Sequence, residues 1–273
     1  TNLLSSASDF CLWGPPYPAP IGNIEREAVA WCTKSGRGTR LIPDGTLTGV
    51  HFVQTPEYIQ ITGTGNFTNL GIPQGDAGGE LDNRGMDGKG NPSKSSFYAQ
   101  TKRLINAVVG GLLYGNTFGL NLQYHEWTEF IGDREFCFRA CIGPRSKQLC
   151  NHVYDVMGCW WVSTRNMVAL INDLLTIDTS CRKNMPANYA PGVFEECLGD
   201  PAQPMGVYGT YTWSQGVSPT PSAHPAPASS SCTTLATVSV TPARRSVAGR
   251  REVADPVPAA RAAIPDPPAA TLV

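Results

Sequence analysis

The sequence predicts an α+β protein with a β-rich N-terminal part, either a sandwich or a small barrel, followed by a disulfide-linked helical hairpin and a disordered C-terminal tail. Glycine (28) and proline (23) are frequent among the 273 residues, and charged residues make up only 16%. This composition favours turns and short strands over long helices. The chain also contains nine cysteines, and every Trp, Tyr and Phe lies before residue 217. The aromatic residues therefore place the folded part within the first 216 residues.

Strand patterns dominate residues 39–72. Residues 47–53 and 58–62 are rich in Val, Ile, Leu and Thr, and in 58–62 apolar residues alternate with polar ones. Such alternation places one face of a strand on a core. Pro43-Asp44-Gly45 and Thr55-Pro56-Glu57 are turn sequences because Pro and Gly suit the backbone angles of turns. This region is the β-rich part.

A helical pattern follows over residues 124–159. Apolar residues recur at near-helical spacing, Gly143-Pro144 breaks the chain, and Ser146 begins a second helix. The apolar positions are Trp127, Phe130, Ile131, Phe136, Phe138 and Ala140 in the first helix and Leu149, Val153, Val156 and Met157 in the second. The pattern predicts two antiparallel helices.

Cysteine spacing supports that hairpin. Cys137 and Cys141 are one helical turn apart, and Cys150 and Cys159 follow the break. Nested bridges, Cys141 to Cys150 and Cys137 to Cys159, can join two such helices, although spacing alone does not fix the connectivity. The full set of disulfide candidates is Cys11 and Cys32, which flank a Pro-rich loop, with Cys137, Cys141, Cys150, Cys159, Cys197 and Cys232. One cysteine of the nine is surplus.

The cysteines also predict the compartment. Disulfides persist only in oxidising compartments, and the chain begins at Thr1, as expected after removal of an N-terminal signal. A reduced intracellular protein with scattered thiols is the competing interpretation. One glycosylation sequon, Asn66-Phe67-Thr68, lies in a Gly/Thr-rich turn. We expect a secreted, extracellular glycoprotein.

The composition divides the chain into a disulfide-stapled domain at 1–216 and a tail at 217–273. The tail has no aromatic residue and ten of the 23 prolines, so it cannot bury enough apolar area to offset the entropy of ordering. Residues 218–227 have the composition of a stiff, O-glycosylated stalk. From about Arg244 the tail is rich in Arg, Ala and Pro. We expect it to be disordered.

Charge and hydropathy exclude several functions. The formal net charge is -1, which gives no electrostatic basis for binding nucleic acid or an anionic membrane. No run of about 18 apolar residues is present, so no transmembrane segment is predicted. No cofactor motif is present either.

Two short motifs resemble catalytic ones but lack their reacting groups. Gly75-Asp76-Ala77-Gly78-Gly79 is similar to the nucleophile loop of chymotrypsin-like proteases, yet Ala77 has no oxygen to attack a carbonyl. His125-Glu126 begins like a zinc-peptidase helix, but Glu129 stands where the second histidine is needed. We predict neither a catalytic residue nor a metal site.

An acidic cluster and a set of aromatic residues leave two alternatives open. Glu126, Glu129, Asp133 and Glu135 can supply a carboxylate pair for glycoside hydrolysis, although acidic residues at this spacing are usually a solvated face. Aromatic side chains can stack on sugar rings, although most such residues belong to a core. The aromatic candidates are Trp13, Tyr17, Trp31, Trp127, Tyr208, Tyr211 and Trp213.

A set of short motifs runs through residues 9–216. They are DFCLWGPP (9–16), ERE (25–27), AWCTK (30–34), GTRLIP (38–43), TGV (48–50), GELD (79–82), HEWTEF (125–130), FC (136–137) and NYAPGVFE (188–195). Together they resemble the secreted macrophage-activating glycoproteins of basidiomycete fungi. The resemblance implies a cell-surface or wall-associated protein with a Ser/Thr-rich stalk and brings no catalytic residues. Members often have a GPI-type C-terminus, and the sequence lacks the apolar tail that this signal needs.

These observations together predict a secreted, non-enzymatic fungal glycoprotein of the cell wall or cell surface, either glycan-binding or host-interacting. The expected partners are a cell-wall polysaccharide or a host cell-surface receptor, and no cofactor is expected. The alternative is a secreted carbohydrate-active hydrolase that uses the carboxylates near Glu126 and Glu129.

Two internal segments, residues 93–108 and 160–182, have the coding pattern of translated introns. Fungal introns commonly begin with GTAAGT and end with CAG. Val162-Ser163 is a direct translation of GTAAGT, and the codons of Cys181-Arg182 can contain the terminal CAG. Removal of the second segment would leave an even number of cysteines. The competing interpretation is an amphipathic helix with apolar positions Met167, Val168, Leu170, Ile171, Leu174 and Leu175.

Overall fold

The computed structural model describes residues 2–85, 88–93, 111–152, 158–161, 182–183, 185–200 and 226–240. These residues belong to one compact unit, 1–243, and residues 244–273 form a separate unit that lies outside the described residues. Most of the described elements are strands, which form two large sheets and one short ribbon. The short elements are helices α1 (Ile21–Ile24) and α3 (Ser146–Leu149), the 3-10 turn η1 (Phe67–Leu70), and the ribbon of β12 (Trp160–Trp161) and β13 (Arg182–Lys183).

The first large sheet, called the N-terminal sheet, has the strand order β4-β3-β2-β1-β8-β9. Its strands are β1 (Asn2–Ser6), β2 (Asp9–Gly14), β3 (Val29–Cys32), β4 (Arg40–Leu41), β8 (Leu113–Gly115) and β9 (Leu122–Tyr124). β1 pairs antiparallel with β2 and parallel with β8. The start of the chain therefore lies in the middle of this sheet.

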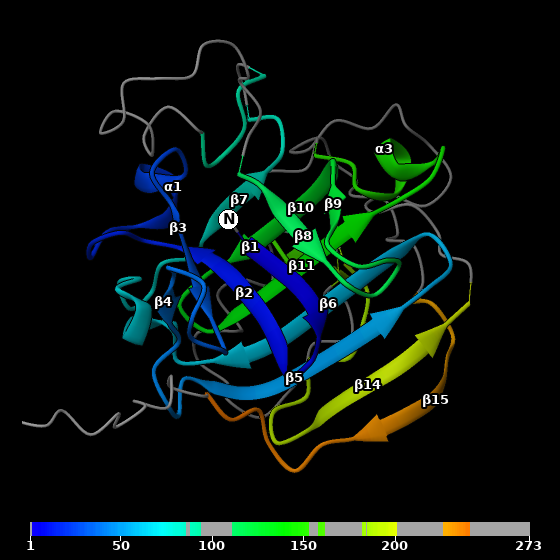
Figure 1. Cartoon of the computed structure of the whole chain (residues 1–273). Helices are drawn as coiled ribbons and strands as arrows, with labels where there is room; N and C mark the ends of the chain where they lie inside the picture. The colour runs from blue at the N-terminus through cyan, green and yellow to red at the C-terminus, as the bar shows by residue number, and fades with distance from the viewer. Residues whose placement is uncertain are drawn as a thin grey trace, which may run out of the picture. The chain divides into compact units, whose positions relative to one another are not determined.

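The second large sheet, called the main sheet, has the order β15-β14-β5-β6-β11-β10-β7. Its strands are β5 (Leu47–Gln54), β6 (Tyr58–Gly65), β7 (Gly79–Asp82), β10 (Glu126–Ile131), β11 (Glu135–Cys141), β14 (Phe194–Gly199) and β15 (Ser229–Thr234). Neighbouring pairs are antiparallel except β14 with β5, which is parallel. Figure 1 shows β1 and β2 of the N-terminal sheet packed across β5, β6 and β11 of the main sheet.

The core lies between the two sheets. Phe10 of β2 stacks on Phe136 of β11 with ring centroids 5.9 Å apart, and Trp13 stacks on Trp127 at 6.1 Å. One cluster of buried apolar residues includes side chains from both sheets. The main sheet therefore has an inner face on this core and an outer face on the opposite side.

The helical hairpin predicted for residues 124–159 is wrong, and the fold is β-rich rather than α+β. This region forms β10, β11 and the single turn α3. All six residues of β10 are buried, because its inner face contacts the core and its outer face is also covered. Burial on both faces replaces alternation with continuous apolar runs, which resemble helical spacing. Val153, Val156 and Met157 lie outside the described residues.

The strands expected at 47–53 and 58–62 are present as β5 and β6. Every residue of β6 except Thr64 is buried, including the polar Gln60 and Thr62. Alternation in β6 therefore separates the core-facing side chains from a second, polar buried surface rather than from solvent. The helices within the described ranges are single turns, too short to span a membrane.

The C-terminal part of the described chain belongs to the main sheet. Residues 226–240 fall within the segment that the composition assigned to the tail, and they include β15 and the buried Val238. Residues 241–273 lie outside the described residues, as do 94–108 and 162–181 within the two predicted introns. Disorder of the remaining tail and the intron hypothesis therefore stay predictions.

Candidate functional site

Glu126 and Glu129, the carboxylates of the alternative hydrolase prediction, lie on opposite faces of β10. An odd separation along a strand reverses the side-chain direction. Both carboxylate oxygens of Glu129 accept the backbone N–H of Trp13, Oε2 at 3.0 Å and Oε1 at 3.2 Å. Glu126 accepts Nδ2–H of Asn83 at 3.2 Å and lies 3.6 Å from Nη2 of Arg84. Glycoside hydrolysis needs two carboxyl groups that face one substrate, and this pair cannot do so.

Glu129 is a buried structural acid. Its side chain has no exposed surface and lies between the sheets. Burial raises the pKa of this carboxyl well above its usual range, and the hydrogen bond from the Trp13 backbone offsets only part of that effect. The Glu129 carboxyl satisfies a backbone donor of β2 that would otherwise be buried without a partner.

Asp133 and Glu135 occupy the turn between β10 and β11 and the start of β11. Asp133 Oδ2 accepts the backbone N–H of Gly75 at 2.8 Å and lies 3.5 Å from Nε of Arg134. Glu135 pairs with Thr64 in the ladder between β11 and β6. The four acidic residues of the predicted region are thus distributed over two faces and a turn.

A polar row crosses the outer face of the main sheet. Thr128, Arg139 and Gln60 are consecutive partners in the register of β10, β11 and β6. All three are at most 1% exposed. Thr128 donates its hydroxyl to Glu80 Oε1 at 2.5 Å. Buried polar groups of this kind require hydrogen-bond partners. The parts of the chain that cover this face are therefore expected to supply those partners.

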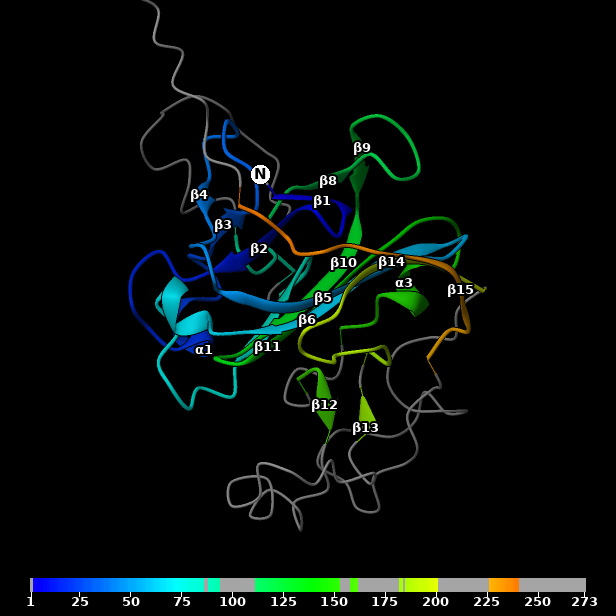
Figure 2. The same cartoon turned by 90° about the horizontal axis from the view of Figure 1, so that it is seen from below.

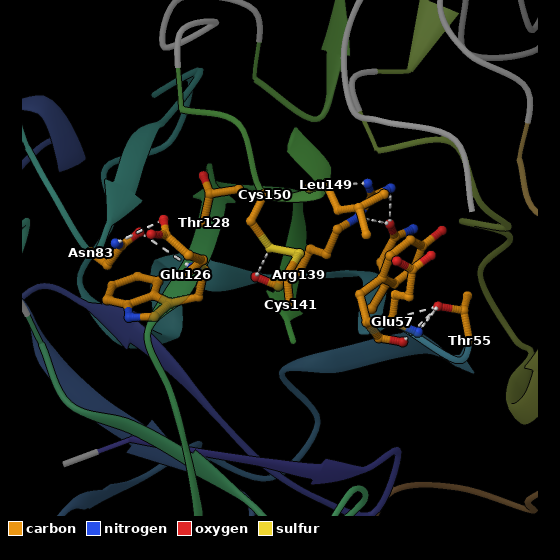
Figure 3. The surroundings of a disulfide bond; sticks show 12 residues. Thr55, Glu57, Asn83, Glu126, Thr128, Arg139, Cys141, Leu149 and Cys150 are labelled. Atoms are coloured by element: carbon orange, nitrogen blue, oxygen red, sulfur yellow. Dashed lines mark hydrogen bonds between the residues drawn. A yellow bond between two sulfur atoms is a disulfide. The ribbon is translucent and has the colours of Figure 1, made fainter. Parts of the chain in front are cut away.

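Arg139 is the centre of that row. Its Nε and Nη2 donate to Gln60 Oε1 at 2.8 and 2.6 Å, and its Nη1 donates to the carbonyl of Leu149 at 2.9 Å. The guanidinium carbon lies 4.1 Å from the ring centroid of Tyr58. Figure 3 shows the side chain extending beside the Cys141–Cys150 disulfide toward Leu149. Burial lowers the pKa of Arg139 below its usual range. The residue joins the sheet to the end of α3.

Residues 185–193, here called the covering segment, cross the outer face beside this row. Gln60 Nε2 donates to the carbonyl of Pro186 at 3.4 Å, and Thr62 Oγ1 donates to the carbonyl of Asn188 at 2.7 Å. A side chain at Gly49 would place its Cβ 2.6 Å from the carbonyl oxygen of Ala190. The approach is too close for any residue with a side chain, so glycine lets the covering segment lie directly on β5.

His51 holds the same segment from β5. Its side chain is 1% exposed. Nδ1 lies 3.0 Å from Glu195 Oε1, and Nε2 lies 3.1 Å from the carbonyl oxygen of Ala190. Glu195 also accepts Nδ2–H of Asn188 at 3.1 Å. Because both ring nitrogens face oxygen acceptors, His51 acts as a cross-link and offers no free nitrogen to a substrate.

The loop that is similar to a protease nucleophile loop is a structural turn. Asp76 Oδ2 accepts the backbone N–H of Ile21 at 2.8 Å, and its Oδ1 accepts that of Gly78 at 3.1 Å. Gly78 has a φ of +94°, and a Cβ there would collide with the carbonyl of Ile131. Glycine is needed for both reasons. The motif therefore anchors α1 and carries no nucleophile.

The described aromatic side chains do not form an exposed row. Trp13 and Trp127 are buried in the core. Trp31 lies between Gly14 and Arg40, whose guanidinium carbon is 5.0 Å from the ring centroid. Tyr17 is 50% exposed and donates its hydroxyl to Glu27 Oε2 at 2.9 Å. The remaining candidates, Tyr208, Tyr211 and Trp213, lie outside the described residues.

Eight cysteines form four disulfides: Cys11–Cys32, Cys137–Cys159, Cys141–Cys150 and Cys197–Cys232. Cys137–Cys159 and Cys141–Cys150 join β11 to residues 150 and 159, which follow it in the sequence, rather than joining two helices. The ninth cysteine, Cys181, lies outside the described residues. Four disulfides fit a secreted protein.

One group of potential metal ligands occurs among the described residues, namely Glu195 with Cys197 and Cys232. The two sulfur atoms are joined in a disulfide, and metal binding by cysteine requires a thiolate. This group therefore cannot hold an ion in the oxidised protein. His125 is exposed and directly precedes β10, whereas the buried His51 lies on β5, and β6 and β11 separate these two strands in the sheet.

Asn66, the predicted glycosylation site, is exposed directly before η1. Its Oδ1 accepts the hydroxyl of Thr68 at 2.7 Å. The acceptor amide and the hydroxyl of the sequon therefore lie together on an accessible turn.

Sequence reasoning missed Arg139, Gln60 and His51, which organise the outer face. A detectable signal was the single charged residue inside the apolar run of β11, since a lone arginine in a buried strand requires a polar network. The covering segment gave no such signal, because its contacts with β6 join residues 126 positions apart.

Comparison with known proteins gives two relatives from the fungus Mycosarcoma maydis. The appressorium protein ROW1 is 43% identical over 238 residues, which are 87% of this chain and 48% of ROW1. The appressorium protein ROW2 is 44% identical over 255 residues, which are 90% of this chain and 75% of ROW2. The chain thus spans about half of ROW1 and three quarters of ROW2. No family model and no solved structure matches. The chain belongs to the family of the appressorium proteins ROW1 and ROW2.

Proposed function

We propose that this chain is a secreted, non-enzymatic fungal glycoprotein that acts at the cell surface or wall of an infection structure. The similarity to ROW2, which extends over 75% of that protein, carries the proposal because ROW2 is named for the appressorium. The four disulfides support the secreted compartment. Cell-wall association and attached glycans are parts of the proposal.

The arrangement of the candidate residues favours a binding or structural role over catalysis. Glu129 is enclosed between the sheets, and Glu126 is engaged with Asn83 and Arg84. The polar groups of the outer face are used to hold the covering segment. These contacts stabilise the covered surface and leave no facing pair of carboxylates among the candidate residues that the structure describes.

The proposed partner is either a cell-wall polysaccharide or a host cell-surface receptor. The two classes differ in what they require from the protein: polysaccharide binding commonly uses exposed aromatic rings, whereas a receptor interface uses a broader mixed surface. The resemblance to macrophage-activating glycoproteins remains a prediction about the host side, because neither relative carries that name.

An epitope-tagged chain in living fungal cells tests the location. We expect antibody to label intact cells and mild external protease to remove the signal, with a cytosolic marker protected as the control. Labelling only after permeabilisation would contradict the proposal. The purified protein should release no reducing sugar from chitin, glucan or mannan preparations, and turnover that Glu126→Gln abolishes would establish the hydrolase instead.

Asn66→Gln should remove one N-linked glycan from the secreted protein. The exposed asparagine and its nearby Thr68 hydroxyl make the sequon accessible. Intact-mass measurement before and after glycosidase treatment checks this, and Thr68→Ala should give the same loss through the other sequon position. A wild-type mass that glycosidase leaves unchanged would show that Asn66 is unmodified.

A further inference from the structure

Residues 229–240, here called the C-terminal strap, lie at the edge of the main sheet. β15 occupies the last position in the strand order, beside β14. All six residues of β15 are exposed. Figure 1 shows β15 (orange) as the outermost strand, alongside β14 (yellow), with which it pairs antiparallel. The strap therefore adds a strand to the sheet without contributing side chains of β15 to the core.

The strap is connected to its neighbour by an unusually long stretch of chain. β14 ends at Gly199 and β15 begins at Ser229, although about two to five residues suffice to join antiparallel neighbours. The effective concentration of a tethered segment falls as the number of connecting residues grows, so a second copy's strap competes better here than it would against a two-residue turn. The strap is thus bound to the β14 edge as a tethered segment would be.

Two kinds of contact hold the strap besides the ladder. Leu235 donates its backbone N–H to the carbonyl of Phe194 at 2.8 Å. Leu235, Val238 and Val240 pack against the main core, and Val238 is 7% exposed. Figure 2 shows this segment (orange) turning back from β15 across the molecule. These three apolar residues, here called the plug, therefore hold the strap by packing outside the ladder.

The covalent tie of the strap is the most accessible of the four disulfides. Cys232 is exposed, whereas the six cysteines of the other three disulfides are at most 3% exposed. Thiol–disulfide exchange requires a thiolate to reach one sulfur atom. A small thiol can therefore reach Cys232 Sγ while the buried bridges stay intact.

We propose that the C-terminal strap is exchangeable and that the β14 edge binds the strap of a second copy of this chain. The edge already binds this sequence within one chain, so the second copy's strap can make the same ladder, plug and disulfide. Reciprocal exchange uses identical surfaces on both chains and closes as a symmetric dimer.

The chemistry of exchange needs no oxidant. A low-molecular-weight thiolate attacks Cys232 Sγ in each of two copies, which forms a mixed disulfide on each chain and releases each Cys197 as a thiolate. The Cys197 thiolate of each copy then attacks Cys232 Sγ of the other copy's mixed disulfide, forms an intermolecular bond and expels the small thiolate. Two intermolecular disulfides replace the two intramolecular ones, and both small thiols are regenerated.

Isotopic mixing tests the proposal. Equal amounts of unlabelled and ¹⁵N-labelled protein are incubated at high concentration with reduced glutathione, alkylated, and digested with chymotrypsin, which separates Cys197 from Cys232 by cleavage at Tyr208, Tyr211 and Trp213. In the dimer fraction, about half of the Cys197–Cys232 peptide pairs should combine one light and one heavy partner. The other three disulfides should stay isotopically uniform.

The Cys11–Cys32 bridge is the matched control, because it also joins neighbouring strands but is fully buried. One outcome would overturn the proposal: a fraction of Cys197 and Cys232 is alkylated, but every remaining Cys197–Cys232 pair is isotopically uniform. That result would show that the strap detaches without exchange. Equal reactivity of the two bridges would also overturn the proposal. Val238→Ala should accelerate exchange several-fold by weakening the plug, and an unchanged rate would contradict strap release as the limiting step.

Discussion

Arg139→Ala should lower the free energy of unfolding by about 2 to 5 kcal/mol. The substitution leaves Gln60 Oε1 and the Leu149 carbonyl without their donors, and it removes a large buried side chain from above Tyr58. Urea unfolding followed by tryptophan fluorescence, under non-reducing conditions, measures the change as a lower midpoint at similar slope.

Arg145→Ala is the matched control for this prediction. Arg145 lies one residue before α3 and pairs with Glu57, but its side chain is 44% exposed. An exposed ion pair contributes at most about 1 kcal/mol, so the two arginines should differ clearly. Equal losses would show that the outer-face network does not hold α3 to the sheet.

Glu129→Gln should stabilise the protein at neutral pH and leave it nearly unchanged at pH 4. Burial raises the pKa of Glu129 in the folded protein, whereas the unfolded chain releases this proton near the usual value. The wild type therefore loses stability as the pH rises above that value, by about 1.4 kcal/mol per pH unit until the folded-state pKa is reached. Glutamine carries no such proton, so the advantage of the variant should grow with pH.

Unfolding curves of both proteins from pH 4 to pH 8 measure this difference. Glu57→Gln provides a control of opposite sign, because Arg145 lowers the pKa of Glu57. That variant should lose a small amount of stability at neutral pH, and the loss should vanish in acid. A pH-independent difference between wild type and Glu129→Gln would show that Glu129 is ionised in the fold.

The sequence allowed β5 and β6 to be predicted because each has β-branched residues bounded by turn sequences. The prediction failed for β10 and β11 because both faces of these strands carry large apolar side chains, which hides the alternation that marks a strand. In β10, Trp127 contacts the core between the sheets while Phe130 packs around Cys137 on the outer face. Apolar residues on both faces give spacings of three and four, which also fit a helix.

The candidate site was less predictable than the strands. Glu126 and Glu129 are close in sequence, yet a single strand directs them to opposite sides. His51 and Ala190 are 139 positions apart, yet they are in contact. Local patterns carry no information on such pairs, since they arise from the order of strands in the sheet. A lone charged residue within an apolar run, such as Arg139, is the one feature of this network that the sequence reveals.

The parallel pairing of β5 with β14 constrains the order of folding. β5 is complete by Gln54, but its partner begins only at Phe194. Contacts so far apart in sequence slow folding because a large loop must close first. During synthesis, β5 therefore presents an unpaired edge while most of the domain is being translated, and unpaired edges recruit other chains. A protein of this topology should depend on chaperones of the secretory pathway until the strand at 194–199 has emerged.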